Sequence, residues 1–348
     1  MNAEHRGRPG TVVRWAVAAA ILMLCLLYVP TPYAVYTPGL VAPVGPMVQT
    51  AGGERDTGGS FMLTTIRMTY ANYWMSLQSM WNPDMLLYSK REIIGDRSQS
   101  EYAARLVYVM QQSQSNAIEA AYRAAEVPYR IVPEQLVVTD APQTAEPGLR
   151  PGDRLQALEG LPFKDAQTLT ELLEGRGGGD SLQWTIIRQG REQFVTTVLQ
   201  QPPADAGAGG LPQALGGLQL AELRKLEPDD PAHVVRIDAG EIGGPSAGLI
   251  FALQVYDDLM PGDLTGGLRI AGTGTIDPSG EVGPIGGISL KITAAEQMGA
   301  ELFLAPRENA EEAAARARQI GSGMKVIAVS SIGEAIEALR REVPTARS

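Results

Sequence analysis

The sequence is poor in the residues that build metal centres and disulfides. Its 348 residues include one cysteine, Cys25, and two histidines, His5 and His233. A disulfide needs two cysteines, and a zinc or iron–sulfur cluster needs several cysteine or histidine ligands, so none of these can form within this sequence. We therefore expect no metal and no cofactor. A catalytic triad of serine, histidine and aspartate would have to use His233.

Positive charge is also scarce. The chain has 29 lysine and arginine residues against 39 aspartate and glutamate residues, which gives a formal net charge of −10 and a pI near 4.9. A chain with this charge has no electrostatic footprint for a phosphate backbone, so nucleic acid is not expected as a partner. With 44% hydrophobic and 20% charged residues the composition is that of a globular protein, and the length predicts two compact units.

One long uncharged stretch lies near the start of the sequence. Residues 15–29 are WAVAAAILMLCLLYV, and no Asp, Glu, Lys or Arg separates Arg14 from Glu54. About 20 apolar residues are needed to cross a bilayer, and neighbouring residues extend the run to that length. We expect a single-pass transmembrane anchor over residues 12–36, with the lipid bilayer as a partner. A cleaved signal peptide is the alternative, although the residues that follow lack a clear small-x-small cleavage site.

Basic residues flank this stretch on one side only. Arg6, Arg8 and Arg14 precede or begin it, and no Lys or Arg follows until Arg55. The positive-inside rule then places the N-terminal tail, residues 1–11, in the cytoplasm. Everything after the anchor is expected on the outer side of the cell membrane.

The residue composition changes twice in the region after the anchor. Residues 37–58 are rich in Gly, Pro and Thr, which indicates a linker. Strand-type residues follow at 59–68. An alanine-rich pattern without Gly or Pro at 101–126 predicts a helix.

The second half of the sequence begins with short strands and turns. They occupy residues 133–200 and include two strands around a turn at Gln189 and Gly190. A stretch rich in Pro, Gly and Ala at 200–217 reads as a flexible joint. From residue 218 onward strands and helices alternate, which predicts an α/β arrangement at the C-terminal end.

A glycine-rich turn, E-I-G-G-P-S-A-G-L at residues 241–249, places Ser246 at the start of an amphipathic helix. Backbone amides at a helix start have no partner within the helix and favour negative charge, such as the oxyanion formed when a hydroxyl attacks a carbonyl. Ser246 is therefore a candidate nucleophile, with Gly244 and Ala247 as supporting residues. An ordinary N-cap serine is the alternative.

Such a hydroxyl needs a base, and with histidine nearly absent the remaining candidate is a lysine of lowered pKa. The sequence has few lysines: Lys90, Lys164, Lys225, Lys291 and Lys325. Lys291 follows a glycine turn in G-P-I-G-G-I-S-L-K-I-T-A-A and has apolar neighbours, so burial would lower its pKa. For an isolated residue, a solvated helical lysine is the alternative.

Taken together, the two segments resemble the proteolytic domain of the Lon family, which has a G-P-S-A-G nucleophile segment and an I-G-G-x-x-x-K segment further along. Here Ser246 and Lys291 lie 45 residues apart. The run R-I-A-G-T-G-T-I-D-P-S-G-E-V between them is similar to a strand-turn-strand of that family, and Thr273 falls where its pattern keeps a threonine beside the dyad. The resemblance implies a Ser/Lys dyad, an α/β (α+β) fold and assembly into homo-oligomers.

A weaker similarity lies earlier in the chain. Residues 110–117, MQQSQSNA, resemble an M-x-x-S-x-x-x-A helix pattern of Lon domains. If both parts belong together, the Lon-like domain is discontinuous, with an N-terminal part at 59–130 and a catalytic part at 205–342. The region at 133–200 is then an insertion.

The inserted region resembles a PDZ domain through G-L-R-P-G-D-R-L at 148–155, a following helix and an R-x-G hairpin. Such domains bind extended peptides by adding a strand to a sheet edge. The resemblance implies recruitment or gating of polypeptide substrates, and a spacer that narrows access is the alternative. The sequence has no G-x-x-x-x-G-K-[ST] motif, so the ATPase part of classical Lon is not expected.

These observations predict a membrane-tethered, ATP-independent serine endopeptidase that cleaves polypeptides outside the cytoplasmic membrane. Ser246 would attack the scissile carbonyl, neutral Lys291 would take and return the proton, and Thr273 would orient the lysine. The alternative is an inactive PDZ adaptor that presents membrane-protein tails to another protease, although an adaptor needs neither residue of the dyad.

Overall fold

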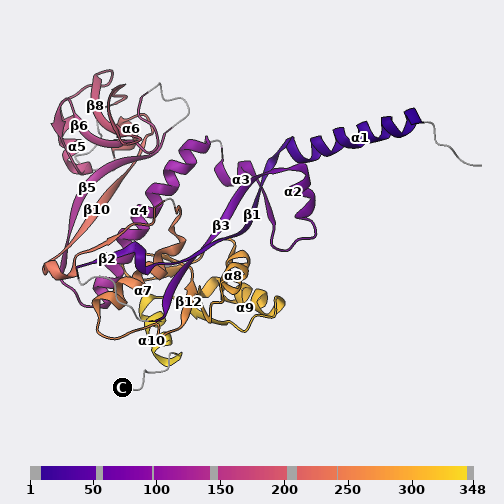
Figure 1. The fold of residues 1–348 in the computed structure, drawn as a ribbon. Helices are drawn as coiled ribbons and strands as arrows, with labels where there is room; N and C mark the ends of the chain where they lie inside the picture. The colour runs from indigo at the N-terminus through magenta and orange to yellow at the C-terminus, as the bar shows by residue number, and fades with distance from the viewer. Residues whose placement is uncertain are drawn as a thin grey trace, which may run out of the picture.

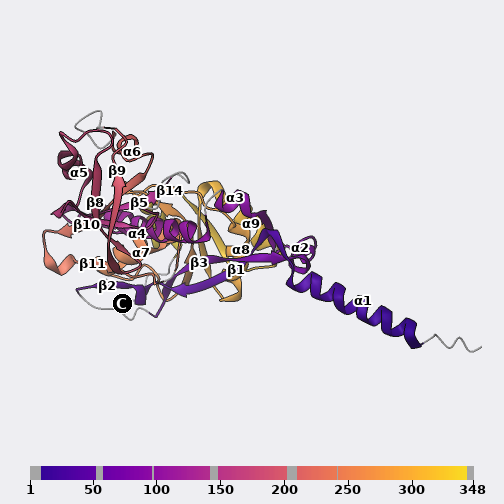
Figure 2. The same ribbon diagram turned by 90° about the horizontal axis from the view of Figure 1, so that it is seen from above.

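The structure is a computed structural model. It describes residues 9–51, 58–95, 98–141, 148–201, 210–240 and 242–342. The chain forms a long N-terminal helix, a main body around a mixed sheet, and a second unit with a sheet of its own (Figure 1). The long helix and the second unit lie at opposite ends of the main body, which Figure 2 shows from above.

Helix α1 (Pro9–Tyr28) is apolar and lies outside the protein core. Its residues 10–28 have a mean hydropathy of 2.1 and are long enough to cross a membrane. The expected anchor at 12–36 is too long, because Pro30 and Pro32 disfavour helical backbone and begin a strand. Residues 1–8 of the expected cytoplasmic tail lie outside the described residues.

The main sheet has six strands in the order β16-β15-β12-β3-β1-β4. They are β1 (Pro30–Pro43), β3 (Ser60–Asn72), β4 (Leu86–Ser89), β12 (Arg269–Gly272), β15 (Leu302–Pro306) and β16 (Lys325–Val329). The neighbours from β16 to β3 run parallel, whereas β1 is antiparallel to both β3 and β4. Strands from before and after the second unit in the sequence thus share one sheet.

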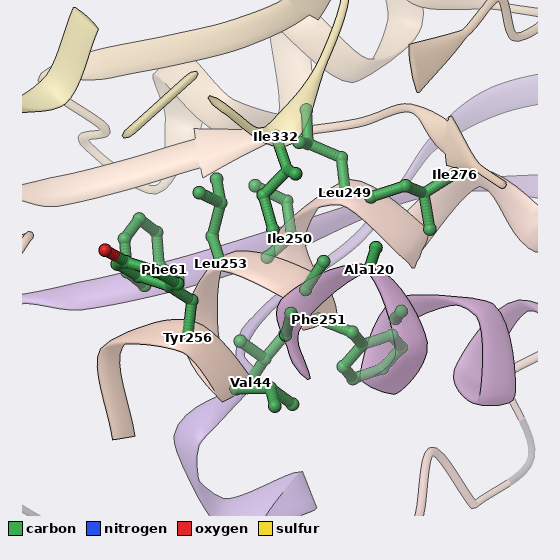
Figure 3. Close-up of a cluster of buried hydrophobic side chains, with 14 of the residues drawn as sticks. Val44, Phe61, Ala120, Leu249, Ile250, Phe251, Leu253, Tyr256, Ile276 and Ile332 are labelled. Carbon is green, nitrogen blue, oxygen red and sulfur yellow. The ribbon is translucent and has the colours of Figure 1, made fainter. Parts of the chain in front are cut away.

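Helices cover both faces of this sheet. One face carries α4 (Gln99–Ala124), α7 (Gly248–Leu259) and α10 (Ile332–Glu342), and the other carries α8 (Ile288–Gln297) and α9 (Ala310–Gln319). Side chains alternate along β3, so Phe61 and Leu63 join the core with α7 while Met62 joins the core with α8 and α9. Figure 3 shows side chains of α7 gathered with Phe61 of β3, Ala120 of α4 and Ile332 of α10.

Short elements complete the main body. They are α2 (Tyr73–Gln78), α3 (Lys90–Ile94), β2 (Val48–Thr50) paired with β11 (Val235–Ile237), β13 (Thr275–Ile276) paired with β14 (Val282–Gly283), and the 3-10 turns η1 (Gly45–Met47), η3 (Pro231–His233), η4 (Pro245–Ala247) and η5 (Arg307–Asn309).

The expected linker at 37–58 is wrong for residues 37–50, which form the end of β1, then η1 and β2. Pairing with β3 holds β1 extended in spite of its prolines, and the register shifts between Pro38 and Val41. Residues 52–57 lie outside the described residues.

The second unit is a sheet in the order β10-β5-β6-β8-β9, with β7 paired to β6. Its elements are β5 (Tyr129–Asp140), β6 (Arg154–Leu158), β7 (Leu161–Pro162), α5 (Ala166–Leu173), β8 (Ser181–Arg188), β9 (Arg191–Val198), α6 (Leu211–Ala214) and β10 (Gln219–Pro228). It has its own hydrophobic core, centred on the fully buried Trp184. The expected bounds of 133–200 are too narrow, because β10 pairs with β5 from end to end.

The stretch at 200–217 explains this difference. Its Gly and Pro content indicated a flexible joint, but Leu211, Ala214 and Leu215 are buried in the core of the second unit. The catalytic part of the main body therefore begins after β10 rather than at residue 205. Residues 202–209 lie outside the described residues.

Two local expectations are confirmed. The helix expected at 101–126 is α4, which begins with a capping box formed by Ser98 and Glu101. The turn between β8 and β9 consists of Gln189 and Gly190, with φ of 53° and 74°, as a two-residue hairpin turn of the primed type requires.

Candidate active site

Ser246 lies in η4, at the entrance to α7. Gly244 has a φ of 90°, a conformation that residues with a Cβ rarely adopt. From α4, the hydroxyl of Ser113 donates a hydrogen bond of 3.0 Å to the carbonyl of Pro245. A Cβ on Gly248 would lie 2.8 Å from the hydroxyl oxygen of Ser113, so glycine is needed for α4 to approach this closely. The two glycines thus shape the turn that presents Ser246.

Lys291 reaches the same place from the first turn of α8. Its side chain is buried, with 2% of the residue exposed. The amine nitrogen Nζ lies 2.8 Å from Ser246 Oγ, 2.9 Å from Thr273 Oγ1 and 2.8 Å from the main-chain oxygen of Thr64. The structure therefore brings together the three side chains singled out in the sequence, and adds a main-chain carbonyl from β3.

The partners of Lys291 determine where its protons point. The carbonyl of Thr64 can only accept, and the hydroxyl of Thr273 donates its own proton to the carbonyl of Ser246, 2.9 Å away. Both oxygens must therefore accept protons from the amine. A neutral amine has two protons and one lone pair, so the lone pair faces the Ser246 hydroxyl. In this arrangement the amine can take the proton of Ser246.

Burial lowers the pKa of Lys291 from 10.5 to about 7. The ammonium form would lose its hydration in this enclosed position, and none of its three oxygen partners carries a negative charge to replace it. The neutral amine that a base requires is therefore well populated near pH 7.

Thr273 and its neighbour tie the nucleophile turn to the segment after β12. The amide of Gly274 donates to the carbonyl of Ser246 over 2.8 Å, and the amide of Leu249 donates to the carbonyl of Gly274 over 3.1 Å. Thr273 is fully buried and contacts both the turn, through this carbonyl, and the amine of Lys291. These contacts are the ones expected of a residue that positions both Ser246 and Lys291.

A pocket of about 410 Å³ opens beside the dyad. Its walls come from β1, β3, α4 and the turn before Ser246, and they include the large side chains of Tyr36, Met68, Tyr102, Leu106 and Met110. Burial raises the pKa of Tyr36 to about 12, so this wall is uncharged at neutral pH. A mostly apolar pocket with a few polar groups at one end suits an uncharged side chain of a bound ligand.

Part of the edge of β3 is open beside this pocket. β12 pairs with β3 only as far as Leu63, and in the described part of the chain no strand takes its place further along β3. Thr64, Thr65 and Ile66 line the pocket at this point. An unpaired strand edge can accept an extended polypeptide as an added strand.

Gly244 and Ala247 line the pocket on either side of Ser246. The amide of Gly244 donates to the carbonyl of Leu106 over 3.4 Å, so this residue shapes the turn. The amides of Gly248 and Leu249 donate to the carbonyls of Pro245 and Gly274. The amides of Ser246 and Ala247 stand at the start of the η4–α7 segment, where main-chain donors lack partners within the helix. They are the groups available to bind an oxyanion.

His233, which a histidine-based triad would need, and the single cysteine lie elsewhere. His233 is in η3, where its carbonyl accepts a hydrogen bond of 2.7 Å from the hydroxyl of Tyr122, and it does not line the pocket. Cys25 is exposed on α1. Neither residue supplies a base or a nucleophile to this site.

Two contributions were not predicted from the sequence. The carbonyl of Thr64 gives no side-chain signal, so only the structure could identify it as a partner of Lys291. Ser113 belongs to the M-x-x-S-x-x-x-A pattern but had no predicted role, and its bond to Pro245 now explains why a serine stands there. In the same pattern Met110 lines the pocket and Ala117 is buried in the core.

A serine at a helix start, hydrogen-bonded to a buried lysine amine beside an open strand edge, has the arrangement that a serine-type peptidase with a lysine base requires. Residues 232–341 match the family described as the Lon protease (S16) C-terminal proteolytic domain. This range contains Ser246, Thr273 and Lys291. The C-terminal part of the chain is thus similar to Lon-type proteolytic domains.

Individual relatives agree with this. The chain is 38% identical over 131 residues to Lon protease 2 of Bacillus subtilis, covering 37% of this chain and 22% of that protein. It is 34% identical over 96 residues to Lon protease 1 of Thermus thermophilus, covering 28% and 12%. It is 37% identical over 93 residues to the Lon protease of Rhizobium meliloti, covering 27% and 11%. The chain therefore spans less than a quarter of the length of these relatives.

Proposed function

We propose that this chain is a membrane-tethered serine endopeptidase that cleaves polypeptides outside the cytoplasmic membrane without ATP. The observation that carries the proposal is the 2.8 Å contact between Lys291 Nζ and Ser246 Oγ. Burying an amine without a counterion disfavours folding, because the group must give up its hydration or its proton. An adaptor without catalytic activity has no use for such a group, so the site favours an enzyme.

The reaction proceeds by acyl transfer. Lys291 takes the proton of Ser246 while Oγ bonds to the scissile carbonyl carbon, and amides at the start of η4–α7 stabilise the oxyanion. The ammonium then returns the proton to the leaving amine, the C–N bond breaks, and an ester remains on Ser246. Water, deprotonated by the same amine, hydrolyses the ester and restores the free serine.

The open edge of β3 supports a polypeptide as the substrate. A chain added there would run past Thr64, whose carbonyl touches the amine of Lys291, and would bring a peptide bond to Ser246. A side chain of that polypeptide would enter the pocket lined by Leu106 and Met110.

Helix α1 supports tethering to a membrane. It is long and apolar enough to span a bilayer, and it makes little contact with the rest of the protein. The basic residues before it favour a cytoplasmic N-terminus and a catalytic domain on the outer side.

The second unit is proposed to act as a PDZ domain that recruits or gates substrates. Its sheet ends in the edge strands β10 and β9, where an extended peptide can add. Its turn at Gly152 lies against α4, since a Cβ there would meet that of Ala104 at 2.9 Å. Ala104 is on a different side of α4 from Tyr102 and Leu106, which line the active-site pocket, so α4 itself is the route from the second unit to the site.

Two further parts of the proposal come from the sequence. The absence of a G-x-x-x-x-G-K-[ST] motif favours activity without ATP. The resemblance to Lon domains implies assembly into homo-oligomers.

The test uses the full chain purified in detergent. We expect it to cleave unfolded casein without ATP, to gain nothing from added ATP and magnesium, and to react at Ser246 with a fluorophosphonate reagent. The Ser246→Ala variant should lose both properties, while Ser181→Ala, which changes an exposed serine of the second unit, should keep them. Casein cleavage that survives in Ser246→Ala at the rate of the unchanged chain would overturn the proposal.

A further inference from the structure

A stripe of large apolar side chains around α2 faces outward. The exposed fractions are 52% for Tyr73, 41% for Trp74, 40% for Leu77, 79% for Met80 and 61% for Trp81. We call these five residues the aromatic platform. Tyr73, Trp74 and Leu77 belong to α2, and Met80 and Trp81 belong to the turn that follows it. On a continuous helix this spacing would form one face, and such a face normally packs on the core of a protein. A contiguous exposed patch of this kind marks a surface that contacts another apolar phase.

The segment around the platform is almost free of charge. Between Met68 and Lys90 the only charged residue is Asp84. Its carboxylate has two partners in the protein. It forms an ion pair with the guanidinium of Arg316 on α9 and accepts a hydrogen bond of 3.0 Å from Thr293 on α8. The outward surface of this segment therefore presents no ionised group that would oppose burial in a low-dielectric environment.

The platform is joined to the end of α1 by one side chain. Asn72 donates a hydrogen bond of 2.7 Å to the carbonyl of Leu27, in the last turn of α1, and accepts one of 2.8 Å from the amide of Met75, in the first turn of α2. It thus caps the C-terminus of one helix and the N-terminus of the other. Both views show α2 beside the C-terminal end of α1 (Figures 1 and 2).

The platform is also fixed to the catalytic body at two places. β3 runs from Thr64, at the dyad, directly to Asn72. At the other end of the platform, Asp84 bonds to Thr293 of α8, two residues after Lys291. The platform and the dyad therefore belong to one rigid frame.

We propose that the aromatic platform lies in the interfacial layer of the bilayer on the side where α1 ends. This inference rests on the proposed tethering by α1. The bilayer is the occupant because the platform adjoins the end of a helix that is apolar enough to span it, and because Trp and Tyr prefer the level of the lipid headgroups. The dyad is then held at a fixed place near the membrane surface.

This position selects the substrates. Thr64 lies eight residues along β3 from Asn72, a distance of roughly 26 Å for an extended strand. Lys291 joins Thr64 to Ser246 through two contacts of 2.8 Å, so the serine lies only a few ångströms further than Thr64 from Asn72 at most. The substrates are then polypeptide segments close to the bilayer surface, such as those next to a membrane anchor.

Depth-dependent quenching of tryptophan fluorescence tests the inference on the full chain in phosphatidylcholine and phosphatidylglycerol vesicles. The chain has four tryptophans, of which Trp184 is buried in the second unit and serves as an internal reference. The Trp15→Phe variant reports on Trp74 and Trp81. With lipids brominated on the upper acyl chain it should lose about half or more of its emission, since two of its three tryptophans lie in the interface.

Two control variants separate the possible results. The variant W74F/W81F keeps Trp15 within α1, and its quenching reports on the tether alone. The variant W15F/W74F/W81F/F194W carries an exposed tryptophan on the second unit, because Phe194 is 69% exposed there, and its emission should be unchanged by brominated lipids.

The inference is overturned if W15F keeps its emission in brominated vesicles while W74F/W81F is quenched, because α1 then spans the bilayer and the platform does not touch it. A blue-shifted but unquenched W15F spectrum has the same consequence and shows the platform buried against protein, such as a second copy of the chain. If W74F/W81F is not quenched either, Trp15 of α1 does not lie in the bilayer. The proposed tethering is then wrong, and this inference, which depends on it, is wrong as well.

Discussion

The hydroxyl of Thr273 donates its proton to the main-chain carbonyl of Ser246, at a distance of 2.9 Å. This bond decides the chemistry of the site, because it leaves Thr273 able only to accept from the amine of Lys291. With the carbonyl of Thr64 accepting the second amine proton, the lone pair has one direction left, toward Ser246 Oγ. A single threonine thus contacts both the amine of Lys291 and the turn that carries Ser246.

The Thr273→Val variant tests this role, because valine keeps the volume but removes the hydroxyl. We expect kcat to fall by about 10- to 100-fold, because the variant keeps the base but loses part of the roughly 10²- to 10⁴-fold rate gain that a well-positioned base provides. The ascending limb of the pH–rate profile should move to lower pH, because the ammonium form loses an acceptor. Thr273→Ser should restore most of the rate. Unchanged kcat in the valine variant would show that the lysine needs no such support.

Removing the base should stop the reaction without harming the fold. Lys291→Met replaces a buried amine with an apolar chain of similar length, so we expect peptide cleavage to fall by about 10³-fold or more and the melting temperature to stay the same or rise. Lys164→Met, on the surface of the second unit, is the matched control and should keep full activity. Cleavage by Lys291→Met at more than a tenth of the normal rate would mean that another group takes the serine proton.

The rate should depend on pH through the same amine. Because the pKa of Lys291 is lowered to about 7 and the neutral form is the active one, kcat/KM should rise with pH and level off above about 8. The measurement is the initial rate on a short peptide between pH 5 and 9, two units on either side of that value. A profile that still climbs steeply at its upper end would indicate an unperturbed lysine.

The lowered pKa of Lys291 should also make the free energy of unfolding depend on pH. Between pH 7 and 10.5 the unfolded chain binds a proton at Lys291 that the folded chain does not, so the free energy of unfolding rises with pH across that window and is constant below it. Lys291→Met lacks this dependence. Chemical denaturation should therefore show the variant more stable than the unchanged chain by a few kcal/mol at pH 7, with the gap closing toward pH 10. A gap that does not change with pH contradicts the lowered pKa.

The sequence was informative where local chemistry and local pattern coincide. Ser246 and Lys291 stand in glycine turns that lead into helices, and the structure brings them together. The helix at 101–126 and the turn at Gln189 and Gly190 likewise depend on neighbouring residues alone.

Features that depend on distant partners were missed. β1 carries prolines that indicate a linker, and only its pairing with β3 holds it as a strand. The end of the second unit was misplaced because β10 joins β5 across a Gly-rich stretch in which Leu211 is buried. The aromatic platform has the periodicity of a core helix, so its outward direction could not be read from the spacing of its residues.

The most direct test of the account is the titration of the Lys291 amine by NMR in the full chain with 13C-labelled lysine. The sequence has only five lysines, at positions 90, 164, 225, 291 and 325, so the resonance of Lys291 can be assigned by its absence from Lys291→Met. The account predicts that this resonance titrates with a pKa of about 7 and moves when Ser246 is modified by a fluorophosphonate. A resonance that titrates near 10.5, the ordinary value for lysine, would contradict it.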